Sequence, residues 1–165
     1  MSLDTQEYRR ALACFPTGVT VVTAVGRRKE IIGITASSFS SVSLDPPLVL
    51  FSLNRNAYSL AAFLSSQHFA VNVLRQDQEQ ISNQFAQALG KKWEGVEYIT
   101  WDSGCPILTN ALASFECKIR HTYQGGDHVI LVGEVLKIIA EPEGDPLLFF
   151  RGRYRQIGPT AEAAR

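Results

Sequence analysis

One segment organises the chain, and it reads Gly33-Ile-Thr-Ala-Ser-Ser-Phe-Ser-Ser-Val-Ser-Leu-Asp-Pro-Pro-Leu-Val-Leu-Phe-Ser-Leu-Asn-Arg-Asn-Ala-Tyr-Ser59. It joins a hydroxyl-rich loop to an Asp-Pro-Pro corner, then to an apolar strand, and then to a polar loop that carries Arg55. Small side chains let backbone N–H groups approach a ligand, and a guanidinium offers paired donors to a phosphate. The segment suits a flat polar ring with a phosphate tail, and an ordinary Ser-rich turn is the alternative.

The composition is typical of a single globular domain. The chain has 165 residues, of which 45% are hydrophobic and 19% charged, and its 16 basic residues balance 16 acidic ones. A chain of this length buries about two-thirds of its unfolded surface. We expect one domain over residues 1–158 and a flexible C-terminal tail over 159–165. Without a clustered positive charge, nucleic acid is not an expected partner.

The cysteines and the N-terminus indicate a cytoplasmic protein. Cys14, Cys105 and Cys117 are odd in number and show no Cys-x-x-Cys spacing, so neither a disulfide framework nor a zinc site is indicated. The N-terminal residues carry acids and no apolar stretch that would serve as a signal peptide. No run of about 20 apolar residues occurs, so we expect no membrane span.

The patterning predicts a mainly β fold, an antiparallel β-barrel with appended helices. Period-two alternation and β-branched runs predict the main strands, at 19–25, 31–35, 48–52, 68–74, 113–123, 129–140 and 146–150. Helical spacing of apolar residues predicts three helices, at 5–15, 59–65 and 77–89.

Three further features of the sequence suggest, without deciding, where a ligand binds. Ser59 can cap the helix over 59–65, whose N-terminus would then form an anion site with the preceding Asn-Arg-Asn loop. Gly33 within a strand indicates a bulge or a close approach to the backbone. His128 follows a Gly-Gly-Asp sequence of hairpin-turn composition, so it is either a strand-start residue or a site residue.

Several catalytic motifs are missing from the sequence. It contains no Gly-x-Gly-x-x-Gly, no P-loop, no Gly-x-Ser-x-Gly and no metal-spaced histidine pair. The chain therefore brings no strong nucleophile and no metal site of its own. If it is an enzyme, a cofactor supplies the reactive atoms.

Five segments in order give the chain a resemblance to a known family. They lie at 15–24 (FPTGVTVVTA), 33–49 (GITASSFSSVSLDPPLV), 69–74 (FAVNVL), 126–128 (GDH) and 152–154 (GRY). Together they resemble the flavin reductase-like family, the short-chain NAD(P)H:flavin oxidoreductases that serve two-component flavin monooxygenases. The resemblance implies an FMN-binding split barrel, a homodimer, and supply of reduced flavin to a separate monooxygenase component.

The resemblance also implies which residues form the site. The residues along the flavin ring and ribityl chain would be Thr35, Ala36, Ser37 and Ser38. Those that hold the phosphate would be Ser52, Asn54, Arg55 and Ser59. Lys92, His128 and Tyr154 would lie near the ring or the nicotinamide, with His128 as the catalytic residue in the role of an orienting donor. The implied reaction is hydride transfer from nicotinamide C4 to flavin N5 between stacked rings.

Several alternatives stay open at the level of sequence. The cofactor can be FMN or FAD, and the hydride donor NADH or NADPH. A flavin carrier or sensor without reductase activity fits the same barrel, as does an oxidase of the pyridoxamine-phosphate type.

Overall fold

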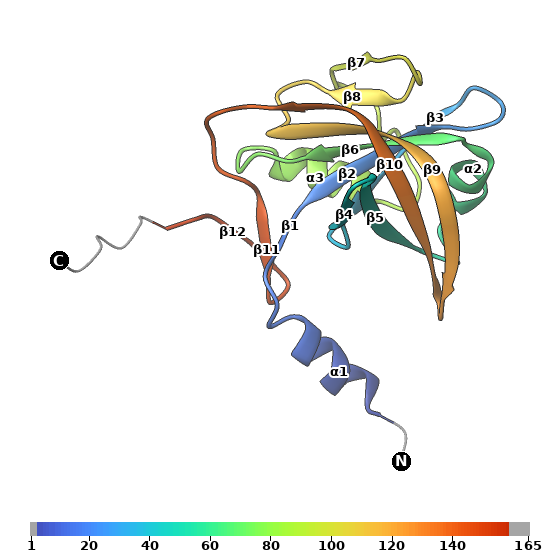
Figure 1. Cartoon of the computed structure of the whole chain (residues 1–165). Coiled ribbons are helices and arrows are strands. Elements are labelled where there is room, and N and C mark those ends of the chain that lie inside the picture. Colours follow the sequence, from blue (N-terminus) through green and yellow to red (C-terminus); the bar gives the residue numbers. More distant parts are fainter. Residues whose placement is uncertain (1–2, 159–165) are drawn as a thin grey trace.

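The computed structural model describes residues 3–158 and shows a mainly β protein (Figure 1). Its three helices are α1 (Thr5–Leu12), α2 (Leu60–Ser65) and α3 (Glu79–Ala86). Its strands are β1 (Thr17–Gly18), β2 (Thr20–Val25), β3 (Ile31–Ala36), β4 (Ser40–Leu44), β5 (Pro47–Asn54), β6 (His68–Val73), β7 (Tyr98–Thr100), β8 (Pro106–Leu108), β9 (Ala113–Gly125), β10 (His128–Ala140), β11 (Leu148–Phe150) and β12 (Arg153–Arg155). The predicted mainly β class with appended helices is confirmed, and the predicted tail over 159–165 lies outside the described residues.

The main sheet has seven strands in the order β3-β2-β6-β9-β10-β5-β4, all paired antiparallel. Its two edge strands, β3 and β4, are joined by residues 37–39 alone. That connection spans at most about 15 Å, whereas the edges of a flat sheet of this size would lie about 29 Å apart. The sheet is therefore strongly curled, and the curl brings the hydroxyl-rich segment next to β5 (Figure 1).

The interior of the curled sheet is filled by aromatic and branched side chains. Phe51 lies at its centre, with ring centroids 5.6 Å from Phe63 and 5.0 Å from Phe69 in edge-to-face geometry. All three rings have no exposed surface. Edge-to-face packing and complete burial make this cluster a main source of stability.

Some elements differ from the prediction. Much of the predicted hydroxyl-rich loop is strand, because residues 40–44 pair with β5 as an edge strand. β5 begins at Pro47, one residue earlier than predicted, since Pro47 pairs only at the end of β4. The helix predicted over 77–89 forms only between Glu79 and Ala86, and the short strand β12 was not predicted.

The first helix stands apart from the rest of the protein. Figure 1 shows α1 below the curled sheet, and none of its residues is buried. Large apolar side chains on and beside it are exposed, at 51% for Tyr8, 56% for Leu12 and 75% for Phe15. Within residues 3–158, no helix has both the length and the apolar character that a membrane span requires.

Candidate functional site

A cavity of about 680 Å³ lies where β3, the end of β5 and the segment after α3 meet. This volume is in the range that holds drug-sized ligands and cofactors. The predicted site residues that line it are Thr35, Ala36, Ser37, Ser38, Ser52, Asn54, Ser59, Lys92 and His128. Residues distant in sequence are thus brought together as the resemblance implied.

Two predicted site residues do not line this cavity. The Arg55 guanidinium contacts the side-chain oxygen of Gln124, in the hairpin formed by β9 and β10. The Tyr154 hydroxyl lies 2.7 Å from Ser82 Oγ and donates to Asn83 Oδ1 at 2.9 Å, so it binds α3. The roles in ligand binding assigned to Arg55 and Tyr154 therefore stay predictions.

The hydroxyl-bearing side of the cavity is held by internal hydrogen bonds. Ser38 Oγ accepts from the Ser52 N–H at 2.9 Å and donates to the Ser52 carbonyl at 3.1 Å, which ties the β3–β4 connection to β5. Thr35 Oγ1 donates to the Ser82 carbonyl at 2.6 Å. The Thr35 hydroxyl hydrogen is therefore used by α3, and only the oxygen lone pairs remain for a ligand.

The loop after β5 forms the polar end of the cavity. Asn54 Oδ1 accepts from the Asn56 N–H at 2.8 Å, which holds the loop in an Asx turn. The prediction that Ser59 caps α2 is wrong, because Ser59 has helical backbone angles and its side chain makes no capping hydrogen bond. A helical Ser59 cannot turn its hydroxyl back onto the first-turn N–H groups in the usual N-cap geometry.

His128 reaches the cavity because it pairs with Asn54 at the end of the β5–β10 ladder. Its Nδ1 lies 2.7 Å from Asp127 Oδ1. The hydrogen bond and the charge of His128 lower the pKa of Asp127, so this carboxylate is ionised at neutral pH. An ionised acceptor fixes the hydrogen on Nδ1, and Nε2 is then left to a ligand.

An aromatic wall, made by the Phe85 and Trp93 rings, lines the cavity beside Gly33. A Cβ on Gly33 would lie 2.5 Å from the Phe85 ring and 3.3 Å from the Trp93 ring. The close approach expected at Gly33 is therefore made by these rings, and the β2–β3 register shows no bulge there. Neither ring was predicted to line the site, and the signal in the sequence was a glycine inside a strand.

Lys92 belongs to the same wall. Its Nζ donates to the Gly33 carbonyl at 3.2 Å and to the Phe85 carbonyl at 3.1 Å. Burial lowers the pKa of Lys92 below its usual value of 10.5, since water is partly excluded from the ammonium. With two donors used by carbonyls, one N–H of the ammonium remains for a ligand in the cavity.

The cavity therefore combines hydroxyl groups, a cation, an imidazole and an apolar wall. This donor set fits a flavin, whose apolar tricyclic ring carries polar atoms along one edge and a polyol chain on the central ring. The described side chains that line the cavity include small hydroxyls and one ammonium.

Comparison with known proteins agrees with this geometry. Residues 12–158 match the model of the family described as "Flavin reductase like domain". FMN reductase (NADH) SmoA of Agrobacterium fabrum is 42% identical over 92% of this chain and 85% of its own. The reductase subunit HsaB of a flavin-dependent monooxygenase from Rhodococcus jostii is 36% identical over 96% of this chain and 80% of its own.

A solved structure extends the agreement to the fold. The NADH:FAD oxidoreductase SgcE6 of Streptomyces globisporus, in complex with NAD and FAD fragments, superposes with a TM-score of 0.91. It is 38% identical, and the match covers 98% of this chain and 99% of that one. With the family match spanning nearly all of the described residues, this chain belongs to the flavin reductase like domain family.

Proposed function

We propose that the protein is an NAD(P)H:flavin oxidoreductase that supplies reduced flavin to a separate monooxygenase. The observation that carries this proposal is the single cavity in which the hydroxyls of 35–38, the Lys92 ammonium and the His128 imidazole converge. The relatives support it, since those named above are flavin reductases or the reductase subunit of a monooxygenase. Two of them, SmoA and SgcE6, are named as NADH-dependent, which favours NADH over NADPH here.

The residues of the cavity would hold a flavin by its edges. Ser37 would donate to the ring and the ribityl chain, and Ser38, whose hydroxyl hydrogen goes to the Ser52 carbonyl, would line the same stretch. Ser52, Asn54 and Ser59 would reach the phosphate end, with Arg55 beside the same loop. When bound, the flavin supplies the redox chemistry, because it takes a hydride from reduced nicotinamide and passes the electrons on. Lys92 would stabilise the negative charge that the ring acquires, since a desolvated cation acts strongly at short range.

His128 would orient the ligand, and it need not gain or lose a proton during hydride transfer. Asp127 accepts the hydrogen on Nδ1, so Nε2 would be the ring nitrogen left to contact the ligand. Hydride transfer needs the two rings close and aligned, and orientation of this kind accounts for a large part of the rate. We assign His128 the positioning of the nicotinamide or the ring edge.

The experiment that tests the proposal crosses NADH and NADPH with FMN, FAD and riboflavin in the absence of air. Loss of the yellow flavin absorbance at a rate that depends on the protein is the expected result. Flavin that binds but stays oxidised under excess reduced nicotinamide would favour a carrier or sensor. Oxidation of a pyridoxamine phosphate without any use of reduced nicotinamide would favour the oxidase alternative.

We also propose that the protein is a homodimer built on a split barrel. The strong curl of the seven-stranded sheet supports the barrel. The exposed apolar side chains of the α1 region support a second copy as their cover, because a free helix with this much exposed apolar surface is unfavourable in water. Light scattering on the purified protein should give twice the mass of one chain, and a monomer would contradict the dimer.

The cytoplasm is the proposed compartment. Cys14, Cys105 and Cys117 are free thiols, which suits a reducing environment. Reduced flavin also reoxidises in air, so a monooxygenase partner in the same compartment would receive it before it is lost.

A further inference from the structure

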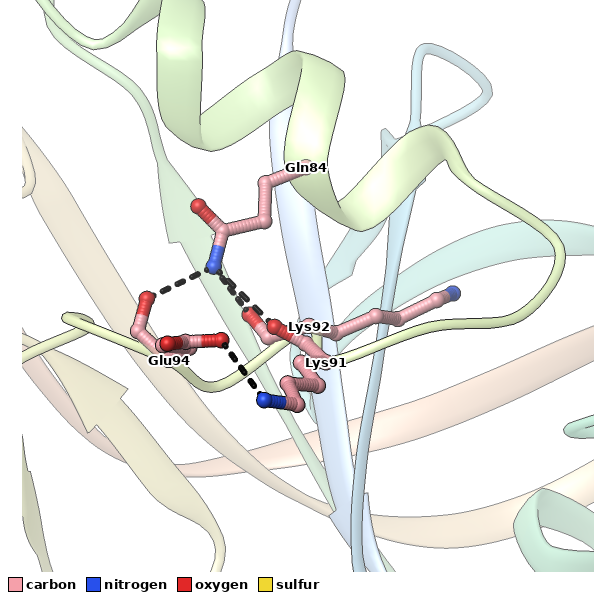
Figure 2. Close-up of polar contacts among 4 residues, drawn as sticks. All are labelled: Gln84, Lys91, Lys92 and Glu94. Atoms are coloured by element: carbon pink, nitrogen blue, oxygen red, sulfur yellow. Dashed lines mark hydrogen bonds and ion pairs between the residues drawn. The ribbon is translucent and has the colours of Figure 1, made fainter.

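Gln84 contacts the cavity wall from behind without lining the cavity. From α3, its Nε2 donates to the carbonyls of Lys92 at 2.8 Å and Glu94 at 2.9 Å, and a third carbonyl, that of Lys91, lies at 3.5 Å (Figure 2). A primary amide has two N–H groups, so the two short contacts account for both of them. One side chain therefore fixes the backbone on both sides of Trp93.

The other side of this segment is fastened to β3. Trp93 Nε1 donates to the Ile31 carbonyl at 3.2 Å, and Lys92 Nζ donates to the Gly33 carbonyl at the same distance. β3 is an edge strand that pairs only with β2. The carbonyls of residues two apart point the same way, so these two side chains occupy the positions that a further strand would use.

The 91–94 segment is thus held by Gln84 on one side and by β3 on the other. Figure 2 shows the Lys92 side chain extending away from Gln84. The Phe85 and Trp93 rings meet edge to face, with centroids 4.9 Å apart. The Lys91–Glu94 ion pair, at 3.7 Å, adds little to this, because its side chains are 84% and 69% exposed.

We propose that Gln84 is a positioning residue of the flavin cavity, acting through the 91–94 segment to place Lys92 and Trp93 against β3. The inference rests on the proposed function, because it takes flavin as the ligand. Gln84 touches no ligand itself. It holds the Lys92 ammonium in place within the cavity, and hence sets the affinity for the ring.

The test compares variants that keep the length of residue 84 and remove its donors. Gln84→Met lacks both N–H groups, and Gln84→Glu keeps polarity but is ionised and cannot donate, so the result does not depend on one variant folding. Gln80→Met is the matched control, since Gln80 lies in the same helix and is exposed. FMN binding is measured by fluorescence titration without nicotinamide, and reductase activity is measured at varied FMN.

Both Gln84 variants should raise the Kd for FMN by about 3- to 10-fold, as expected for the loss of two neutral hydrogen bonds that support a site. The KM for FMN should rise by the same factor while kcat at saturating FMN changes by less than about twofold, because the reacting atoms are untouched. Hydrogen exchange should quicken within residues 88–95 only. Gln80→Met should match the parent protein in all three measurements.

A double variant decides whether Gln84 acts through Lys92. If it does, Gln84→Met should weaken FMN binding much less in a Lys92→Met background than in the parent protein. If the rise in Kd for FMN in the double variant equals the product of the rises in the two single variants, the inference is overturned. Gln84 variants that bind FMN like the Gln80→Met control would also overturn it. A parent protein that binds no flavin would instead refute the proposed function, which separates the two failures.

Discussion

Gly33→Ala is the substitution that most directly tests the aromatic wall of the cavity. The added Cβ would lie 2.5 Å from a Phe85 ring carbon, and ring and backbone cannot both stay in place at that distance. Overpacking of this kind costs about 1–3 kcal/mol. For a chain of this length, that cost lowers Tm by about 3–10 °C. The ring would move away from β3, and FMN affinity should fall together with stability.

The assay combines thermal unfolding with FMN titration. Gly18→Ala is the control, because a Cβ on Gly18 meets no heavy atom within 4 Å; its Tm should stay unchanged or rise slightly. Adding Phe85→Leu to Gly33→Ala should recover part of the loss, since a smaller side chain leaves room for the methyl group. A Gly33→Ala protein with the stability and FMN affinity of the control would refute the close approach.

Three further predictions follow from other parts of the structure. Arg55→Ala should raise the Kd for FMN by about 10-fold or more, because a charge-assisted contact with the phosphate is lost. Riboflavin, which has no phosphate, should bind unchanged in the same titration, and equal losses for both ligands would reject the phosphate role. Folding lowers the pKa of Lys92 from its usual 10.5. At a pH between the pKa of the folded protein and that of the unfolded chain, the unfolded chain therefore binds more protons. The unfolding free energy should therefore rise with pH in that window, and urea titrations should show a smaller rise for Lys92→Met. Phe51→Ala should cost about 3–5 kcal/mol in urea unfolding, since it empties the centre of the core; a loss below about 1 kcal/mol would contradict the central position of the ring.

The long strands were predictable because their patterns are strong and local. The half-buried alternation over 113–123 and the hairpin composition before Val129 predicted β9 and β10, which pair as expected. β4 was missed, since its Ser-rich sequence becomes a strand only through pairing with β5. The residues of β12 lack a periodic pattern, and three residues paired to β11 are too few to show one.

The resemblance named residues that the structure brings to one cavity, while their roles in ligand binding stay predictions. The hydroxyls of 35–38 and His128 line one cavity, as the five matching segments implied. The aromatic wall depends on contacts between residues about 50 to 60 positions apart, such as Gly33 with Phe85 and Trp93, and no local pattern encodes such contacts. No signal in the sequence indicated Gln84, because its proposed role depends on the Lys92 and Glu94 carbonyls, which the turn after α3 brings within reach.

The way β3 is covered has a consequence for aggregation. A strand edge with free carbonyls readily recruits a strand from another molecule. Here Trp93 donates to the Ile31 carbonyl and Lys92 to the Gly33 carbonyl, so the same two side chains that complete the ligand wall also block the addition of a foreign strand at this edge. A flavin that steadies this wall should therefore keep the protein in solution longer on mild heating, beyond any gain in Tm.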